Sequence, residues 1–127
     1  MNPIKVYVAG KYSANTTIET LQNIGRGRKV CAELFEQGFA PYCPWHDASF
    51  IIDNPSMNVS KSHFQQCSNL WLLTADALFI IPDSSTSVGT QAEIKLAKDN
   101  NIPIFYSISD LRDYRFQLIQ KDKKEIK

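Results

Sequence analysis

The sequence predicts an α/β fold in three layers, with a parallel sheet of four or five strands between two layers of helices. Short apolar runs at residues 4–9, 39–43, 76–81 and 102–106 have the length and the β-branched and aromatic content of buried strands. Longer segments with helical spacing separate them, and strand, helix and strand in this order form right-handed βαβ units. This arrangement is that of flavodoxin-like and Rossmann-like domains.

The first strand ends at Gly10, and a loop of small and polar residues follows over residues 10–15. Gly10 is explained either by a positive φ or the close approach of a ligand, or by an ordinary strand-terminating turn. The loop lies at the carboxyl end of its strand, which is the edge where ligands bind in parallel α/β sheets.

A long helix follows, capped by Thr16 or Thr17 and extending to Gln37. Gly25 and Gly27 interrupt it, and each costs about 1 kcal/mol relative to alanine in a helix. They therefore indicate either a break in the helix or close packing against another backbone. The spacing assigns a set of residues to the side that faces the sheet, namely Leu21, Ile24, Cys31, Leu34 and Phe35.

The second strand contains Pro41, which favours an edge position because proline cannot donate to a β ladder. Residues 44–61 have no regular period and are too apolar for a free linker, so we expect a functional loop such as a lid or an interface. His46 and Asp47 lie in this loop. A structural or substrate-facing histidine is favoured over a metal site, because no other ligands accompany the pair.

A helix at residues 62–74 leads into the third strand. Its residues at helical spacing are Phe64, Cys67, Leu70 or Trp71, and Thr74. Asp76 opens the strand at residues 76–81. Since a carboxylate there is costly without local partners, we interpret Asp76 as structural rather than catalytic.

The remaining elements complete a βαβ unit around which the fold is organised. A Ser- and Gly-rich turn at residues 82–89 follows the third strand, a helix runs over residues 88–100, and the fourth strand occupies residues 102–106. The turn lies outside the carboxyl end of its strand, where a ligand is expected.

Glu93 interrupts the apolar side of this helix. The half expected to face the sheet holds Val88, Ala92, Leu96 and Ala97. Glu93 falls on the same half. Because burial of a carboxylate without partners is costly, Glu93 either lies on the flank and reaches water or points into the ligand cleft as a catalytic group.

Length and composition bound the remaining possibilities. A last helix is expected at residues 110–119, so that residues 1–119 form one domain and residues 120–127 a solvated tail.

A net charge of +1 gives no argument for binding a nucleic acid polymer, and the apolar runs are too short to span a membrane. The N-terminus does not resemble a signal peptide, and three widely spaced cysteines favour neither a disulfide framework nor a zinc site. We expect a cytoplasmic protein with no metal or other cofactor.

Four sequence features occur in an order typical of one known superfamily. They are KVYVAGKYS at residues 5–13, QNI at 22–24, GFAPYCP at 38–44, and TADAL at 74–78 with SVGTQAE at 87–93. Together they resemble the nucleoside 2-deoxyribosyltransferase-like superfamily, which includes small phage and bacterial relatives and a branch of nucleoside monophosphate N-glycosidases. The resemblance covers roughly residues 4–106.

The resemblance implies roles for the residues at the matching positions. Glu93 matches the nucleophilic glutamate, which attacks or shields the anomeric carbon as the base departs, and Tyr7 matches a tyrosine close to that glutamate. Gly10 matches a glycine that lines the nucleotide pocket. Lys11 and Ser13 follow it in the same loop and are candidates for binding the substrate or its phosphate.

Ser87 and Gly89 match positions that hold the 5′-phosphate in the monophosphate-specific branch. The free-nucleoside branch typically has an aspartate at the position of Ser87, so the serine favours nucleoside monophosphates. Ser87 is also suited to cap the helix that begins at Val88, and capping competes with phosphate binding for the same N–H groups.

Ser68 departs from the superfamily pattern. It stands eight residues before Asp76, where the relatives usually have an aspartate that contacts the sugar hydroxyls and assists proton transfer. A hydroxyl hydrogen-bonds a sugar but does not act as a carboxylic acid or base. The departure permits slower hydrolysis, an altered sugar or base preference, or binding without turnover. Asn69, His63 and Asp47 are the neighbours that would supply the missing group.

The sequence therefore predicts cleavage or transfer at the N-glycosidic bond of a nucleoside 5′-monophosphate, with Glu93 as nucleophile and with Tyr7 and Ser68 beside it. The resemblance implies a homo-oligomer, because these small domains often complete the pocket with residues of a neighbouring subunit. Two alternatives stay open. The first is a nucleotide-binding module without catalysis, which Ser68 favours. The second is a glycohydrolase that acts on a larger nucleotide such as NAD, although the short chain argues against it.

Overall fold

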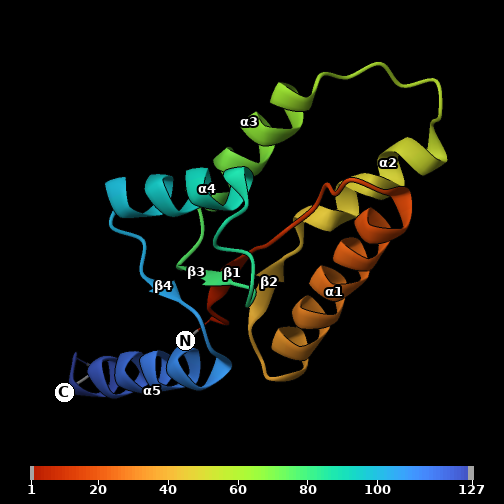
Figure 1. Ribbon diagram of the computed structural model, residues 1–127. Coiled ribbons are helices and arrows are strands. Elements are labelled where there is room, and N and C mark those ends of the chain that lie inside the picture. Colours follow the sequence, from red (N-terminus) through yellow and green to blue (C-terminus); the bar gives the residue numbers. More distant parts are fainter. Residues whose placement is uncertain (1, 126–127) are drawn as a thin grey trace.

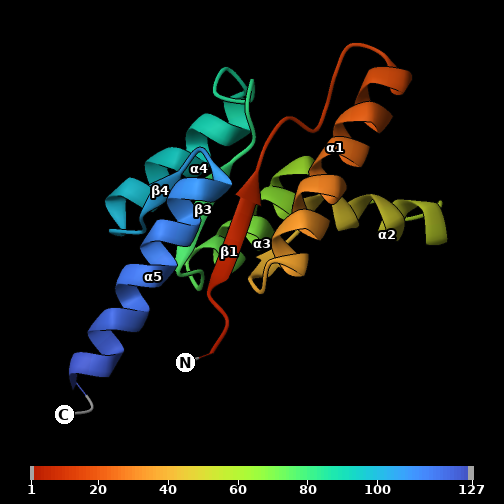
Figure 2. The ribbon, with the colours of Figure 1, turned by 90° about the horizontal axis from the view of Figure 1, so that it is seen from below.

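The computed structural model describes residues 2–125 and confirms the three-layer α/β fold with a parallel sheet (Figures 1 and 2). The elements in chain order are β1 (Lys5–Ala9), α1 (Thr17–Glu36), β2 (Ala40–Tyr42), the 3₁₀ helix η1 (Pro44–His46), α2 (Asp47–Asp53), α3 (Lys61–Leu72), β3 (Ala77–Ile80), α4 (Val88–Asp99), β4 (Ile104–Phe105) and α5 (Ile108–Glu125). Within the described residues, no helix is both long and apolar enough to cross a membrane.

The four strands are parallel and follow the order β2-β1-β3-β4. Pro41 lies in β2, and its position at the edge of the sheet is confirmed. The chain leaves β1 towards β2 on one side, and β3 towards β4 on the other. The crossovers therefore diverge between β1 and β3, which opens a crevice at the carboxyl ends of these two strands.

Side chains of β1 alternate between the two faces of the sheet and so define its two helical layers. Val6 and Val8 pack into a core with α1 and α5, whereas Tyr7 and Ala9 pack into a second core with α3 and α4. Figure 1 shows the two pairs of helices on opposite sides of the strands. The crevice and the α3–α4 layer lie on the same side as Tyr7.

The long first helix forms as expected. Thr16 is its N-cap, with Oγ1 accepting a hydrogen bond from the Glu19 N–H at 3.1 Å. α1 continues unbroken past Gly25 and Gly27, so close packing explains the second glycine. A Cβ atom on Gly27 would lie 2.3 Å from the indole ring of Trp45, which occupies that space instead.

The sheet-facing assignment for α1 is wrong for two of its five residues. Ile24 and Leu34 are buried, as is Cys31, but the side chains of Leu21 and Phe35 are 58% and 73% exposed. The buried strip is narrow because Trp45 packs onto α1 at Gly27, and the flanks of the helix extend past this contact.

The predicted buried face of α4 is also wrong in part. Thr90, Glu93 and Ala97 are buried, whereas Val88 is 83% exposed and Ala92 is exposed as well. The buried residues are three or four positions apart, so the stripe that meets the sheet is centred on Glu93. Val88 stands in the first turn, beyond the edge of the sheet.

In α3 the apolar residues at helical spacing are not the buried ones. Cys67, Leu70 and Trp71 are exposed, and the buried residues are Ser68 and Leu72, which are one turn apart. The helix therefore turns a face with a serine towards the sheet. Of the residues noted at helical spacing, Phe64 is half-buried and lies on the same face as Ser68 and Leu72.

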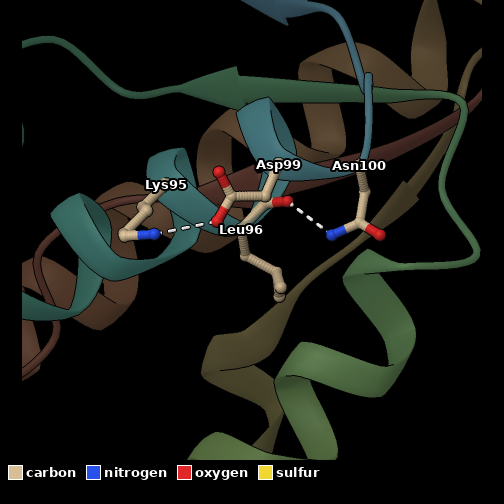
Figure 3. A network of polar contacts seen from close by, with 4 residues as sticks. All are labelled: Lys95, Leu96, Asp99 and Asn100. Atoms are coloured by element: carbon tan, nitrogen blue, oxygen red, sulfur yellow. Dashed lines mark hydrogen bonds and ion pairs between the residues drawn. The ribbon is translucent and has the colours of Figure 1, made fainter.

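Asp76 is structural, as the sequence indicated. Its Oδ2 accepts a hydrogen bond from the Lys5 N–H at 2.8 Å, at the start of β1. At the far end of α4, the Asn100 side chain donates to the Leu96 carbonyl oxygen at 2.8 Å, next to the Lys95–Asp99 ion pair at 2.9 Å (Figure 3). These contacts cap the end of α4 that is remote from the crevice.

Two segments are more regular than expected. Residues 44–53 form η1 and α2 instead of an irregular loop. α5 extends to Glu125, so residues 120–125 continue this helix and are not a separate tail, while residues 126–127 of the predicted tail lie outside the described residues.

Candidate active site

A cavity of about 670 Å³ opens at the carboxyl ends of β1 and β3, where the crossovers diverge. Its wall includes all eight residues that the sequence singled out, namely Tyr7, Gly10, Lys11, Ser13, Ser68, Ser87, Gly89 and Glu93. They come from β1 and its loop, from α3 and from α4. Since these elements are far apart in the sequence, the fold itself assembles the cavity wall.

Glu93 lies in the second turn of α4 with only 7% of its surface exposed. The interpretation in which this carboxylate lies on the flank and reaches water is therefore wrong. Burial raises the pKa of Glu93 from 4.5 to about 7, and the nearby Tyr7 hydroxyl acts in the opposite direction. Close to neutral pH, both the protonated and the ionised form are populated.

Tyr7 belongs to the residues around the cavity but is fully buried, and its hydroxyl lies near Glu93. Burial raises the pKa of Tyr7 strongly, and the charge of Glu93 adds to this shift. The two side chains are close enough for this electrostatic effect, yet the hydroxyl makes no hydrogen bond of acceptable geometry within the described residues. Buried hydroxyls without a partner are uncommon, and one beside a buried carboxylate is a candidate catalytic group.

The ring of Tyr7 is held in place by a ladder of aromatic side chains. It stacks on Tyr42 with ring centroids 5.4 Å apart, and Tyr42 stacks on Trp71 at 5.5 Å. Trp71 lies on the exposed side of α3. The stacking fixes the direction in which the Tyr7 hydroxyl points.

Ser68 is buried in α3 and lies near the Tyr7 hydroxyl, whose pKa it lowers. Three neighbours, Asn69, His63 and Asp47, were named as alternatives for the function of the aspartate that Ser68 replaces. Asp47 lines the cavity, but His63 and Asn69 are not part of its wall. Burial raises the pKa of Asp47, so this side chain is the better placed acid of the three.

The N-terminus of α4 forms one side of the cavity. Ser87 caps it, since its Oγ accepts a hydrogen bond from the Thr90 N–H at 3.4 Å, a long contact. Val88 and Gly89 follow in the first turn and both line the cavity. The positive end of the helix dipole therefore faces the space in front of Glu93.

The loop after β1 is fixed by polar contacts rather than by an unusual backbone. The indole Nε1 of Trp45 donates to the Lys11 carbonyl oxygen at 3.0 Å, and the Lys11 N–H donates to Ser84 Oγ at 3.1 Å. Gly10 does not have a positive φ. A Cβ atom there would lie 3.0 Å from Ile81 and 3.1 Å from Trp45, so Gly10 is needed for packing beneath the cavity.

Trp45, Lys61 and Gln65 also line the cavity and were missed by sequence reasoning. The spacing in the sequence contains a signal for two of them, Lys61 and Gln65. Lys61, Gln65 and Ser68 are four and three residues apart, so they share one face of α3. That face is polar, and a search for apolar periodicity passes over it.

Within residues 2–125, no three His, Cys, Asp or Glu side chains come together in a way that would hold a metal ion. The sequence profile of the family described as "Domain of unknown function (DUF7768)" matches residues 4–107. This range contains the whole sheet, α1 to α4 and every residue of the cavity wall. No curated protein matches the chain.

Proposed function

The chain belongs to the DUF7768 family, and from its cavity we propose that it cleaves or transfers at the N-glycosidic bond of a nucleoside 5′-monophosphate. The observation that carries the proposal is the composition of one cavity wall. A buried carboxylate, Glu93, lies next to a free hydroxyl, Tyr7, and on the same helix as an N-terminus suited to an anion.

In the proposed reaction, an ionised Glu93 oxygen attacks C1′ of the sugar while the bond from C1′ to the base breaks. The electron pair of that bond leaves with the base, which takes up a proton. Water then attacks C1′ of the glycosyl ester, which releases the sugar phosphate and restores Glu93. In a transfer reaction a second base takes the place of water. Tyr7 orients the carboxylate for the attack, and its hydroxyl stabilises the negative charge that returns to Glu93 when water releases the sugar.

The 5′-phosphate is proposed to bind at the first turn of α4, with Lys11 as counter-charge. Gly89 and Glu93 are one helical turn apart, or about 6 Å along the axis. This separation matches the length of a sugar from its phosphate to C1′. Anchoring the phosphate at Gly89 thus brings C1′ to Glu93. The carboxylate and the sugar are then held in the geometry of the reaction, which lowers the entropic cost of the attack.

Ser68 favours a second candidate function, a nucleotide-binding module without turnover. The wall opposite Glu93 carries this serine, and the available carboxylate, Asp47, comes from a different element. If Asp47 does not reach the leaving base, the cavity binds the nucleotide and releases it unchanged.

Base release from ribo- and deoxyribonucleoside 5′-monophosphates, measured by chromatography, tests the proposal. Free nucleosides and NAD are assayed in parallel as alternative substrates. The matched control for Glu93→Gln is Glu33→Gln, the same change at an exposed position of α1. We expect release from monophosphates that Glu33→Gln retains and Glu93→Gln loses. Binding without release supports the binding module, and the absence of both contradicts the proposal.

A homo-oligomer and a cytoplasmic location belong to the same proposal. α2 exposes Phe50, Ile51 and Ile52, and Ile51 also lines the cavity, so a neighbouring subunit on α2 would reach the site. The free, buried thiols of Cys31 and Cys43 fit a reducing compartment. Light scattering of the wild type and of Ile52→Lys distinguishes an oligomer from a monomer.

A further inference from the structure

Two amide side chains form a pair on the α3 wall of the cavity. Gln65 Nε2 donates to Asn69 Oδ1 at 2.9 Å, and both residues are half-buried. Gln65 lines the cavity, whereas Asn69 lies behind it. Asn69 therefore decides which end of the Gln65 amide faces the cavity without itself touching a ligand.

The end that faces α4 is the amide oxygen. Gln65 Oε1 is the nearest atom to the place that a Cβ on Gly89 would occupy, at 3.9 Å. With Nε2 engaged by Asn69, the oxygen accepts a hydrogen bond and has no proton to donate. The cavity thus presents an acceptor beside the first turn of α4, where the phosphate is proposed to bind.

An acceptor at this point suits a hydroxyl group and repels a phosphate oxygen, which is itself an acceptor. The pair can also be reversed. If both amides turn over, Asn69 Nδ2 donates to Gln65 Oε1, and Gln65 Nε2 faces α4 as a donor to phosphate. Since one hydrogen bond joins the two amides in either arrangement, the reversal costs little.

The rest of this wall is positively charged. Lys61 lies one turn before Gln65 on the same face of α3 and lines the cavity, as does Lys11 from the β1 loop. In the described part of the chain, neither lysine forms an ion pair. Both favour a phosphate over a neutral hydroxyl, and the amide pair adds a hydrogen bond whose donor or acceptor character depends on which end of Gln65 faces α4.

We propose that Gln65, paired with Asn69, adapts the cavity to either a phosphate or a hydroxyl group at the 5′ end of the ligand by reversing its amide. The inference rests on the proposed function and adds a ligand-binding residue and its positioning partner to it. In one orientation Gln65 binds the 5′-hydroxyl of a nucleoside, and in the reversed orientation it binds the 5′-phosphate of a nucleotide.

The test replaces Asn69 with aspartate, in the Glu93→Gln background so that no probe is consumed. A carboxylate only accepts, so Asn69→Asp holds the Gln65 nitrogen and keeps the oxygen towards α4. Titration calorimetry with 2′-deoxyadenosine 5′-monophosphate and with 2′-deoxyadenosine gives the two affinities. We expect the affinity for the monophosphate to fall about tenfold and that for the nucleoside to change less than about twofold.

Gln66→Glu is the matched control, because it adds the same charge at an exposed position of α3. Gln65→Glu is a second variant, which removes the donor directly and is expected to give a larger loss for the monophosphate. An equal loss of monophosphate affinity with Asn69→Asp and Gln66→Glu would overturn the proposed role of Gln65 and Asn69, and so would an unchanged ratio of the two affinities. If the Glu93→Gln protein binds neither of these probes nor the other nucleotides of the base-release panel, the proposed function fails, and the role of Gln65 and Asn69 fails with it.

Discussion

The two faces of the sheet are built from different kinds of residue. The face covered by α1 and α5 buries apolar side chains and cysteines, among them Val6, Val8 and Leu34. The face covered by α3 and α4 carries buried polar groups, and the hydroxyls of Tyr7 and Thr90 have no partner within the described residues. Unpartnered polar groups cost stability, so the first face stabilises the domain, and the second is the one that we propose binds a ligand.

Leu34→Ala tests the stabilising face and has the largest expected effect on stability. Leu34 is fully buried in α1, and truncating such a residue leaves a cavity in a packed core. We expect the free energy of unfolding to fall by about 2–5 kcal/mol, measured by urea denaturation. Ligand affinity of the folded fraction should not change. Loss of affinity without loss of stability would break the distinction between the two faces.

Glu93→Gln tests the face covered by α3 and α4. It should raise the free energy of unfolding, whereas Leu34→Ala lowers it. The folded-state pKa of Glu93 is raised from 4.5 to about 7, so the ionised form is less stable in the folded protein than in the unfolded chain. This penalty is absent below pH 4.5, grows as the pH rises, and is complete above pH 7. The variant should match the wild type near pH 4.5 and exceed it by about 3 kcal/mol at pH 8. A variant that is less stable at pH 8 would show that the Glu93 carboxylate has favourable partners.

The pH dependence of base release measures the pKa of Glu93 a second time, through the rate of the reaction. If ionised Glu93 is the nucleophile, kcat/KM should rise with pH and level off above about pH 7. About 1% of the carboxylate is ionised at pH 5, so the rate there should be roughly a hundredfold below the plateau. A rate that falls as the pH rises through 7 would assign Glu93 the role of an acid instead.

Tyr7→Phe is expected to have the smallest effect on stability. It removes a buried hydroxyl that has no hydrogen-bond partner in the described structure and keeps the ring stacked on Tyr42. The free energy of unfolding should stay equal or rise by about 1 kcal/mol, while base release falls. Thermal denaturation and the release assay measure the two effects. A loss of stability would indicate that the hydroxyl is satisfied within the protein.

The order of elements and the position of the cavity were predictable because they depend on local sequence, whereas the roles of the residues in its wall were named from the resemblance to a superfamily. Glycine and serine clusters at strand ends define the loops, and Thr16 and Ser87 are the caps that their side-chain chemistry favours. Because parallel strands present their carboxyl ends at one edge, the loop at Gly10 and the turn before Val88 had to meet in one cavity.

The orientation of the helices was not predictable from hydrophobic periodicity. α3 and α4 bury Ser68 and Glu93 beside the apolar Leu72 and Ala97, and they leave Trp71 and Val88 exposed, so apolar periodicity predicts the buried face only in part. A ligand-binding wall requires polar side chains on the inner face, so apolar periodicity fails where the site is. The contact of Trp45 with Gly27 is a tertiary one, and no local pattern encodes it.

Release of free base from a nucleoside 5′-monophosphate at pH 8, by the wild type, Glu93→Gln and Glu33→Gln, tests the central claim most directly. We predict release by the wild type and by Glu33→Gln, and a loss of roughly a thousandfold or more in Glu93→Gln, which lacks the nucleophile. Equal release by all three proteins would contradict the assignment of Glu93 and of the α3–α4 face as the active site.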